Sequence, residues 1–378
     1  MGGRFQLRAG LGLVLAGLLG CSEDATTPQA WAWELPDGFP VPAVPDDNPM
    51  TVEKVTLGHH LFYEQRLSGN ETQSCASCHL QELAFTDGLA RAIGSTGEEH
   101  PRNAMGLVNT AYVPTFNWAN PVVRTLQEQA LTPMFGDDPV ELGLDGETMR
   151  ERLAADEAYQ ALFEAAYPEA DELFTVDQVA KAIASFERTI VSADAPYDRY
   201  LAGDTDALGA EAREGIALFF SEKFECFHCH GGFNLSSAVD HEGNVFDQSA
   251  FFNNGLYDID GEGTYPLDNQ GLFTFTGAPA DMGKFRPPSL RNVELTAPYM
   301  HDGSIATLEE VLEHYARGGR LIESGPDAGD GKENPYKNDF VAGFEMSERE
   351  KTALLAFLRA LTDTTVATDP RFADPGPP

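Results

Sequence analysis

Basic residues are scarce in this sequence. Only 25 lysines and arginines stand against 60 aspartates and glutamates, so the formal net charge is −35. A surface with that charge repels the phosphates of nucleic acids, which excludes nucleic-acid binding as a function. The acidic residues are spread along the chain instead of forming runs, a distribution typical of a solvated surface. A basic protein is the complementary kind of partner.

Long apolar runs are absent after the N-terminal segment. No later segment approaches the roughly 18 apolar residues that a membrane-spanning helix needs. At the start, Arg4 and Arg8 precede an apolar run over 11–19, and Cys21 follows shortly after it. This pattern predicts a lipoprotein-type export signal over 1–21, with lipobox residue Cys21 as the lipidated start of the mature chain; a plain signal peptide with an incidental cysteine is the alternative. We therefore expect an exported protein of the periplasm or cell envelope that touches the membrane only through a lipid anchor on Cys21.

Strand-like alternation is also missing, so the fold class predicted is mainly α. Helical patterns cover roughly 146–166, 175–192, 209–222, 307–317 and 347–362. Three of these patterns begin with capping boxes, in which a Thr or Ser is followed three residues later by Glu or Gln. The boxes are Thr175–Gln178, Thr307–Glu310 and Ser347–Glu350.

Cysteine is rare, and four of the five cysteines fall into two copies of one motif. The copies are "CASCH", with Cys75, Cys78 and His79, and "CFHCH", with Cys226, Cys229 and His230. Two thiols at this spacing can add to the vinyl groups of a haem, and the following histidine then reaches the iron from the proximal side. A pair of zinc or redox sites is the alternative, which export and the two histidines disfavour. The sequence thus predicts two covalently bound c-type haems and no disulfide.

The two motifs lie 151 residues apart, a spacing that suits two haem domains. A segment rich in Pro, Gly and Asp over 192–209 separates them and is typical of a domain boundary. We expect an N-terminal haem domain over 51–205 and a C-terminal haem domain over 206–365, with the haems facing a shared interface. A linker over 22–50 precedes them, and a tail over 366–378 follows.

Several ordered segments resemble the bacterial di-haem cytochrome c peroxidases and their relative MauG. They are "LGHHLFYEQRLSGNETQSCASCH", "AFTDG", "HPRNAMGLVNTAYVP", "LQEQALTPMF" and "PPSLRNVELTAPYMHDGSIATLEEVLEHYARGG". The likeness extends from about Met50 to Thr362. Two further segments, "WELPDGFPVPAVPDDNPMT" and "NWANP", are similar to the MbnH-like di-haem enzymes, which are associated with methanobactin and copper-handling genes.

The resemblance implies that the N-terminal motif carries the haem that binds hydrogen peroxide. It also implies a distal pocket made of Gln129, Pro133 and Glu141, in which Glu141 is the acid–base group. Glu128 is the competing assignment for that role, and a solvated helical acid is the alternative for either glutamate.

The resemblance also bears on access to the iron of the N-terminal haem. Other peroxidases of the family close the oxidised iron with a histidine, and Ser95 stands at that position here. We therefore expect an iron that is open without reductive activation. His100 is out of register with the closing histidine and is interpreted as either a distal-pocket or a surface residue.

The resemblance also implies groups between the two haems. Trp118 matches a tryptophan that can relay an electron, although it can equally serve only in packing. Asn103, with the backbone carbonyls of Thr296 and Pro298, matches an interdomain Ca²⁺ site made of oxygen ligands.

Tyr315 is the residue that sets the expected activity. Fourteen residues after the His of "HDG", electron-transfer peroxidases carry a methionine ligand to the second haem and MauG carries a tyrosine; here that position is Tyr315. A packing tyrosine, with Met300 or a histidine as ligand, is the alternative. Methionine raises the reduction potential of a haem, whereas a phenolate oxygen stabilises high-valent iron. Tyr315 therefore favours oxidation of a partner protein over scavenging of hydrogen peroxide.

These features imply an enzyme that uses hydrogen peroxide to form a high-valent di-haem state and oxidise a partner protein. For an MbnH-like enzyme the reaction is conversion of tryptophan to kynurenine in a secreted copper-binding, MbnP-like partner. The first alternative is a peroxidase that reduces hydrogen peroxide with electrons from a small cytochrome or cupredoxin. The second is a non-enzymatic electron-transfer cytochrome with both irons six-coordinate.

Overall fold

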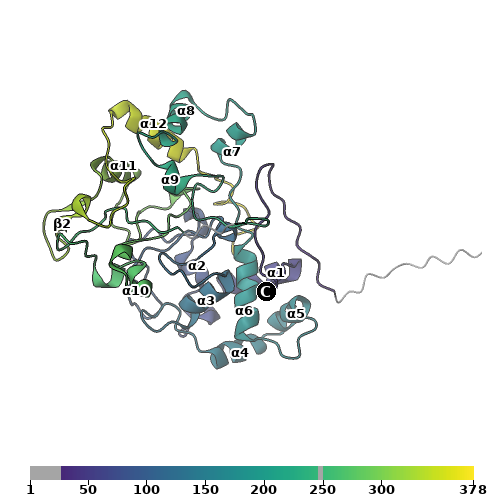
Figure 1. Ribbon diagram of the computed structural model, residues 1–378. Coiled ribbons are helices and arrows are strands. Elements are labelled where there is room, and N and C mark those ends of the chain that lie inside the picture. Colours follow the sequence, from purple (N-terminus) through teal and green to yellow (C-terminus); the bar gives the residue numbers. More distant parts are fainter. Residues whose placement is uncertain (1–26, 246–249) are drawn as a thin grey trace, which may run out of the picture.

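A computed structural model describes residues 27–245 and 250–378 and shows a mainly helical protein, as predicted (Figure 1). The predicted export signal, with Cys21, lies outside the described residues. The α-helices are α1 (Val52–Tyr63), α2 (Cys75–Cys78), α3 (Leu126–Phe135), α4 (Gly146–Ala154), α5 (Glu157–Ala166), α6 (Val176–Glu187), α7 (Pro196–Leu201), α8 (Ala210–Phe219), α9 (Phe227–His230), α10 (Phe273–Thr276), α11 (Leu308–Arg317) and α12 (Glu348–Arg359).

The remaining regular structure is short. The 3₁₀ helices are η1 (Gln65–Leu67), η2 (Gln81–Leu83), η3 (Thr110–Tyr112), η4 (Leu267–Asn269), η5 (Pro279–Asp281), η6 (Val293–Leu295) and η7 (Gly331–Glu333). Strand β1 (Leu321–Ile322) pairs antiparallel with β2 (Gly329–Asp330), with Leu321 opposite Asp330. Within the part of the chain that the structure describes, no helix combines the length and apolar character needed to cross a membrane.

Helix boundaries follow local capping chemistry. The three predicted capping boxes are present, at the starts of α6, α11 and α12. The helical pattern over 146–166 forms two helices, because the chain breaks between α4 and α5. Asp156 causes the break: its carboxylate accepts a hydrogen bond from the backbone N–H of Ala158 (3.0 Å) and starts a new helix. The helix expected over 175–192 ends earlier, at Glu187.

The N-terminal half is built around close contact between α1 and α6. A Cβ atom at Gly58 would lie 1.9 Å from the carbonyl oxygen of Ala182, so only glycine permits this helix separation. Large buried side chains fill the space beside the contact, including Phe62 and Phe186, whose ring centroids are 5.3 Å apart. The helices of this half lie in the lower part of Figure 1. They form a rigid support for the first haem motif, which follows α1.

The C-terminal half contains the same kind of close helix contact at a glycine, between α8 and α12. A Cβ atom at Gly215 would lie 2.0 Å from the carbonyl oxygen of Ala353, and Phe219 and Phe357 pack next to it with ring centroids 5.0 Å apart. These helices lie together in the upper part of Figure 1. The second haem motif follows α8 directly, so the contact fixes its position.

The C-terminal segment returns to the N-terminal half of the molecule. Val366 and Phe372 belong to the buried cluster around α1 and α6, and the Tyr63 hydroxyl donates to the carbonyl of Phe372 (2.6 Å). Figure 1 accordingly shows the C-terminus beside α1 and α6. The segment predicted as a tail is therefore packed, while the domain limits themselves stay a prediction.

Candidate functional site

The first haem motif forms one helical turn, α2, at the wall of a cavity of about 40 Å³. Ser74 and Ser77 cap the turn, with the backbone N–H of Ser74 donating to Ser77 Oγ (3.0 Å). The turn brings Cys75, Cys78 and His79 to the same cavity. Nδ1 of His79 lies 2.8 Å from the carbonyl oxygen of Phe85, which orients the ring and leaves Nε2 as the ligand atom.

The second motif also forms a short helical turn, α9, at a larger cavity of about 270 Å³. Cys226, Cys229 and His230 line it, and Nδ1 of His230 lies 3.2 Å from the carbonyl oxygen of Leu235. None of these four cysteines forms a disulfide within the described residues, which leaves every sulfur available for a haem. In both places two thiols and a backbone-oriented imidazole face one cavity, so the residues present fit a covalently attached haem.

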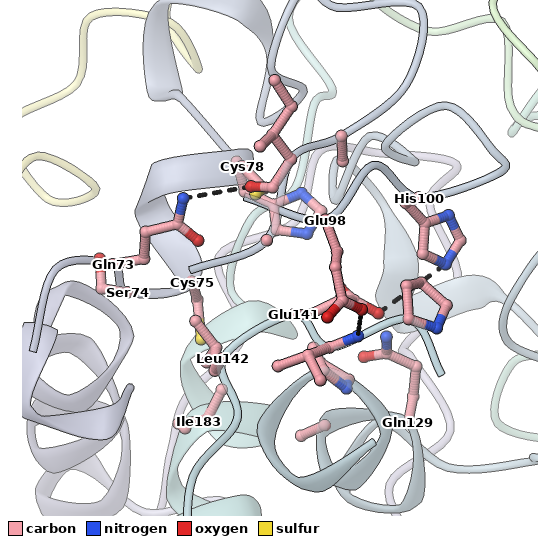
Figure 2. Close-up of a pocket in the computed structure, with 18 of the residues that line it drawn as sticks. Gln73, Ser74, Cys75, Cys78, Glu98, His100, Gln129, Glu141, Leu142 and Ile183 are labelled. Carbon is pink, nitrogen blue, oxygen red and sulfur yellow. Dashed lines mark hydrogen bonds and ion pairs between the residues drawn. The ribbon is translucent and has the colours of Figure 1, made fainter. Parts of the chain in front are cut away.

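The smaller cavity also brings together the predicted distal residues. Gln129 and Pro133 reach it from α3, and Glu141 reaches it from the loop that follows. Figure 2 shows Gln129 and Glu141 at this cavity. Burial raises the pKa of Glu141 to about 7. A carboxyl group with this pKa is present in both protonation states near neutral pH, as an acid–base group requires.

His100 lies in the cavity wall, so the structure places it among the distal-pocket residues. Its Nε2 lies 3.9 Å from Oε1 of Glu141, and Figure 2 shows the two side chains pointing toward each other. The backbone N–H of Arg102 donates to Nδ1 (3.1 Å) and holds the ring in this orientation. Burial lowers the pKa of His100, which favours the neutral ring. Ser95 bonds instead to the carbonyl of Leu142 (3.1 Å) and is not among the residues lining this cavity.

Glu128 caps a helix and does not occupy the acid–base position that was its alternative role. Its carboxylate accepts hydrogen bonds from the backbone N–H groups of Arg124 (3.0 Å) and Thr125 (3.1 Å), which closes the capping box of α3. The side chain is exposed and is not among the residues lining the cavity. This geometry favours Glu141 for the acid–base role.

Sequence reasoning missed two further glutamates of the cavity. Glu98 accepts a hydrogen bond from the backbone N–H of Val140 (3.0 Å) and so holds the loop that carries Glu141. Glu187, at the end of α6, is 5% exposed, and its Oε2 has no hydrogen-bond partner among the described residues. Burial raises the pKa of Glu187 to about 8. Only the packing of α6 brings this residue to the cavity, so no sequence spacing indicates it.

Tyr315 lies on α11 and lines the larger cavity with the second haem motif. Burial raises the pKa of its phenol to about 12, while a hydrogen bond with the side chain of Asn254 acts in the opposite direction. The rival ligands Met300 and His301 line the same cavity. Nε2 of His301 is buried and has no hydrogen-bond partner in the described chain. The position of Tyr315 is compatible with ligation, and its role as a ligand stays a prediction.

Trp118 also lines the larger cavity, and its indole Nε1 donates to the backbone carbonyl of Asn103 (2.9 Å). Asn103, Thr296 and Pro298, the residues expected to bind Ca²⁺, line this cavity as well. Nδ2 of Asn103 donates a hydrogen bond to the carbonyl of Leu89 (2.7 Å), which leaves the amide oxygen of Asn103 as the atom that would bind Ca²⁺. These oxygen donors fit a hard cation, and the calcium site stays a prediction.

A mainly helical protein with two cavities, each holding a haem-attachment turn, defines a di-haem protein of the cytochrome c type. Residues 52–206 match the family model for di-haem cytochrome c peroxidase. The methylamine utilization protein MauG of Methylorubrum extorquens is 36% identical over 317 residues, which cover 84% of this chain and 80% of that protein. The cytochrome-c peroxidase IdrP1 of Denitromonas iodatirespirans is 37% identical over 360 residues, which cover 88% of each protein.

A solved structure is also similar over nearly the whole length. It is a MauG-like protein associated with microbial copper homeostasis, with a TM-score of 0.89 and 50% identity, covering 92% of this chain and 99% of that chain. The chain belongs to the di-haem cytochrome c peroxidase and MauG family. It is therefore an oxidoreductase with two c-type haems, which sets aside both the zinc alternative and the non-enzymatic cytochrome.

Proposed function

We propose that this enzyme uses hydrogen peroxide to oxidise a partner protein, and that the reaction is conversion of tryptophan to kynurenine in a secreted copper-binding partner. The observation that carries the proposal is Tyr315 at the cavity of the second haem motif, where a phenolate oxygen can bind the iron. The similarity to a MauG-like protein associated with copper homeostasis supports this kind of partner.

The haems, when bound, supply the iron that reacts with peroxide and the capacity to hold two oxidising equivalents. At the distal cavity Glu141 takes the proton from one peroxide oxygen and returns it to the leaving oxygen. Its pKa of about 7 allows both transfers near neutral pH. The Gln129 amide orients the peroxide by hydrogen bonding, and Pro133 supplies an apolar wall without an N–H group.

Trp118 conducts electrons between the two haem sites in this proposal. Its indole is held by the bond to the Asn103 carbonyl, in the segment that follows the first motif, while its ring faces the cavity of the second motif. Calcium held by Asn103, Thr296 and Pro298 stiffens the same region. Tyr315 would hold the second haem, which would accept electrons from the partner protein at a distance, so the partner would not need to enter either cavity.

The proposed reaction on the partner balances with two molecules of hydrogen peroxide for each tryptophan. Both peroxides are reduced to water, and the indole ring is opened to N-formylkynurenine with two oxygen atoms added across its C2–C3 bond. Hydrolysis then releases formate and leaves kynurenine. Export through the segment 1–21, with an anchor on Cys21, would place the enzyme where such a secreted partner is found.

A direct test incubates the di-haem enzyme with hydrogen peroxide and a secreted copper-binding protein of the proposed class. Mass spectrometry should find kynurenine in place of one tryptophan, and a partner lacking that tryptophan should stay unmodified. The competing function is a peroxidase that takes electrons from a small cytochrome or cupredoxin, as the names of several relatives indicate for those proteins. Rapid peroxide-dependent oxidation of such a donor, with the partner unchanged, would support the peroxidase instead.

A further inference from the structure

The amide of Asn254 joins two of the side chains that could bind the second haem iron. Its Nδ2 donates to Sδ of Met300 (3.3 Å), and its side chain is hydrogen-bonded to the phenol of Tyr315. Asn254, Met300 and Tyr315 all line the cavity that holds Cys226 and Cys229. One side chain thus contacts both an oxygen and a sulfur candidate ligand.

The backbone around Asn254 is firmly held. Its carbonyl oxygen lies 3.0 Å from Nε2 of His314, the residue before Tyr315 in α11. The preceding residue, Asn253, is fully buried, and its side chain donates to the carbonyl of Met282 (2.9 Å) and accepts from the N–H of Gly255 (2.8 Å). The amide of Asn254 is therefore presented from a fixed loop to the helix that carries Tyr315.

Met300 is held in an unusual backbone conformation. Its φ of +74° lies in the left-handed region, which non-glycine residues rarely adopt. The conformation keeps its thioether in the cavity, where it is available as a competing ligand. A sulfur that accepts an N–H hydrogen bond has part of its lone-pair density engaged, which weakens it as a ligand.

We propose that Asn254 is a positioning residue that selects the Tyr315 oxygen over the Met300 sulfur as the ligand of the second haem. A carboxamide carries two N–H groups, so one can hold the sulfur while the other donates to the phenolate oxygen. Hydrogen bonds to a charged acceptor are stronger than those between neutral groups, so the phenolate gains more from the amide than the thioether does. The inference rests on the proposed function, because it requires Tyr315 to be the ligand.

The first experiment compares the spectra and reduction potentials of Asn254→Leu, Met300→Leu and the double variant. In Asn254→Leu the tyrosine-ligated fraction should fall by about tenfold or more, the scale of a lost hydrogen bond to a charged group. A sulfur-to-iron charge-transfer band should replace the tyrosine spectrum, and the potential of that haem should rise. Met300→Leu should keep the tyrosine spectrum, and the double variant should lack the sulfur band. Wild-type spectra and potential in Asn254→Leu would overturn the inference, even if the variant is less stable.

A second variant, Asn254→Asp, keeps the size and shape of the side chain in case the leucine variant fails to fold. Its carboxylate has no N–H to donate to the Tyr315 oxygen, so the tyrosine-ligated fraction should fall as it does in Asn254→Leu. An unchanged tyrosine spectrum would overturn the inference. Asn338→Leu is the matched control, because the backbone N–H of Asn338 donates to the carbonyl of Asn253 (2.9 Å), next to Asn254, while its side chain accepts from the N–H of Phe340 (3.0 Å). It should keep the wild-type spectrum.

Tyr315→Phe separates this inference from the proposed function. If that variant keeps the wild-type spectrum, Tyr315 is not the ligand and the proposed function loses its basis. If it changes the spectrum while both Asn254 variants do not, the ligand assignment stands and the selection by Asn254 is wrong.

Discussion

Nε2 of His100 lies 3.9 Å from Oε1 of Glu141 in the wall of the cavity that holds the first haem motif. This separation is longer than a hydrogen bond, so the two side chains can share a small oxygen ligand between them. The pair thus combines a carboxyl group whose pKa is near 7 with an imidazole whose pKa burial lowers.

Glu141 should make the reaction with hydrogen peroxide depend on pH. Because burial raises its pKa to about 7, the carboxyl group is mostly protonated below that pH and cannot accept a proton; the rate should therefore rise as pH increases through about 7. Glu141→Gln should remove this step and slow the reaction by about 10²–10⁴-fold while both haems remain. Stopped-flow absorbance over a pH series measures both effects. Glu128→Gln is the control and should change only helix stability. If Glu128→Gln slowed the reaction with hydrogen peroxide and Glu141→Gln did not, Glu128 would be the acid–base group instead.

His100→Leu should shift the pH dependence of the peroxide reaction to higher pH. Replacing a polar ring with an apolar side chain makes the surroundings of Glu141 less able to stabilise its charge, so its pKa should rise by up to about one unit. The rate at neutral pH should then fall without loss of the rate at high pH. His100→Gln, which keeps a polar group at this place, should restore most of the wild-type profile. An identical profile in the leucine variant would show that His100 has no part in the peroxide reaction.

The first iron should be open in the oxidised protein, because Ser95 occupies the position of the closing histidine. Electron paramagnetic resonance should show one high-spin and one low-spin haem, and peroxide should react without prior reduction. Replacing both Cys75 and Cys78 with alanine should leave one covalent haem and remove the high-spin signal. Two low-spin signals, with reactivity only after partial reduction, would contradict this prediction.

Tyr315→Phe should leave both haems attached but change the spectrum of the second one, and the partner should no longer be oxidised. Tyr315→Met tests potential separately from coordination: it should keep the iron six-coordinate, raise its reduction potential and favour electrons from a small redox donor. If Tyr315 only packs, Tyr315→Phe should cost about 1 kcal/mol in the free energy of unfolding and leave the low-spin spectrum unchanged.

Gly58→Ala should destabilise the N-terminal half. The new Cβ would lie 1.9 Å from the Ala182 carbonyl, so α1 and α6 must separate, at a cost of about 1–3 kcal/mol in the free energy of unfolding. Gly209→Ser is the control, because a Cβ there meets no atom within 4 Å and serine suits the N-cap of α8. Denaturant unfolding of the di-haem protein measures the difference. Equal stability of the two variants would show that the helix contact can relax.

The sequence by itself determined the features that depend on neighbouring residues. Haem attachment needs two thiols and an imidazole within five consecutive positions. The sequence is therefore enough to predict Cys226, Cys229 and His230 as a haem-attachment motif. Capping boxes such as Thr307–Glu310 are equally local, because three residues of helix bring the two side chains to each other's backbone. The roles implied for Tyr315 and Glu141 came from resemblance, since spacing cannot say which side chain faces a haem.

Only the tertiary structure decided which distant groups meet. His100 and Glu141 lie 41 positions apart in the sequence, and they face each other because Glu98 holds the loop next to Glu141. Glu187 reaches the same cavity because α6 packs against α1. Asn254 meets Tyr315 because a loop is bonded to α11 through His314. Such contacts arise from helix packing and long-range hydrogen bonds, whose partners are set by the whole chain and leave no fixed spacing in the sequence.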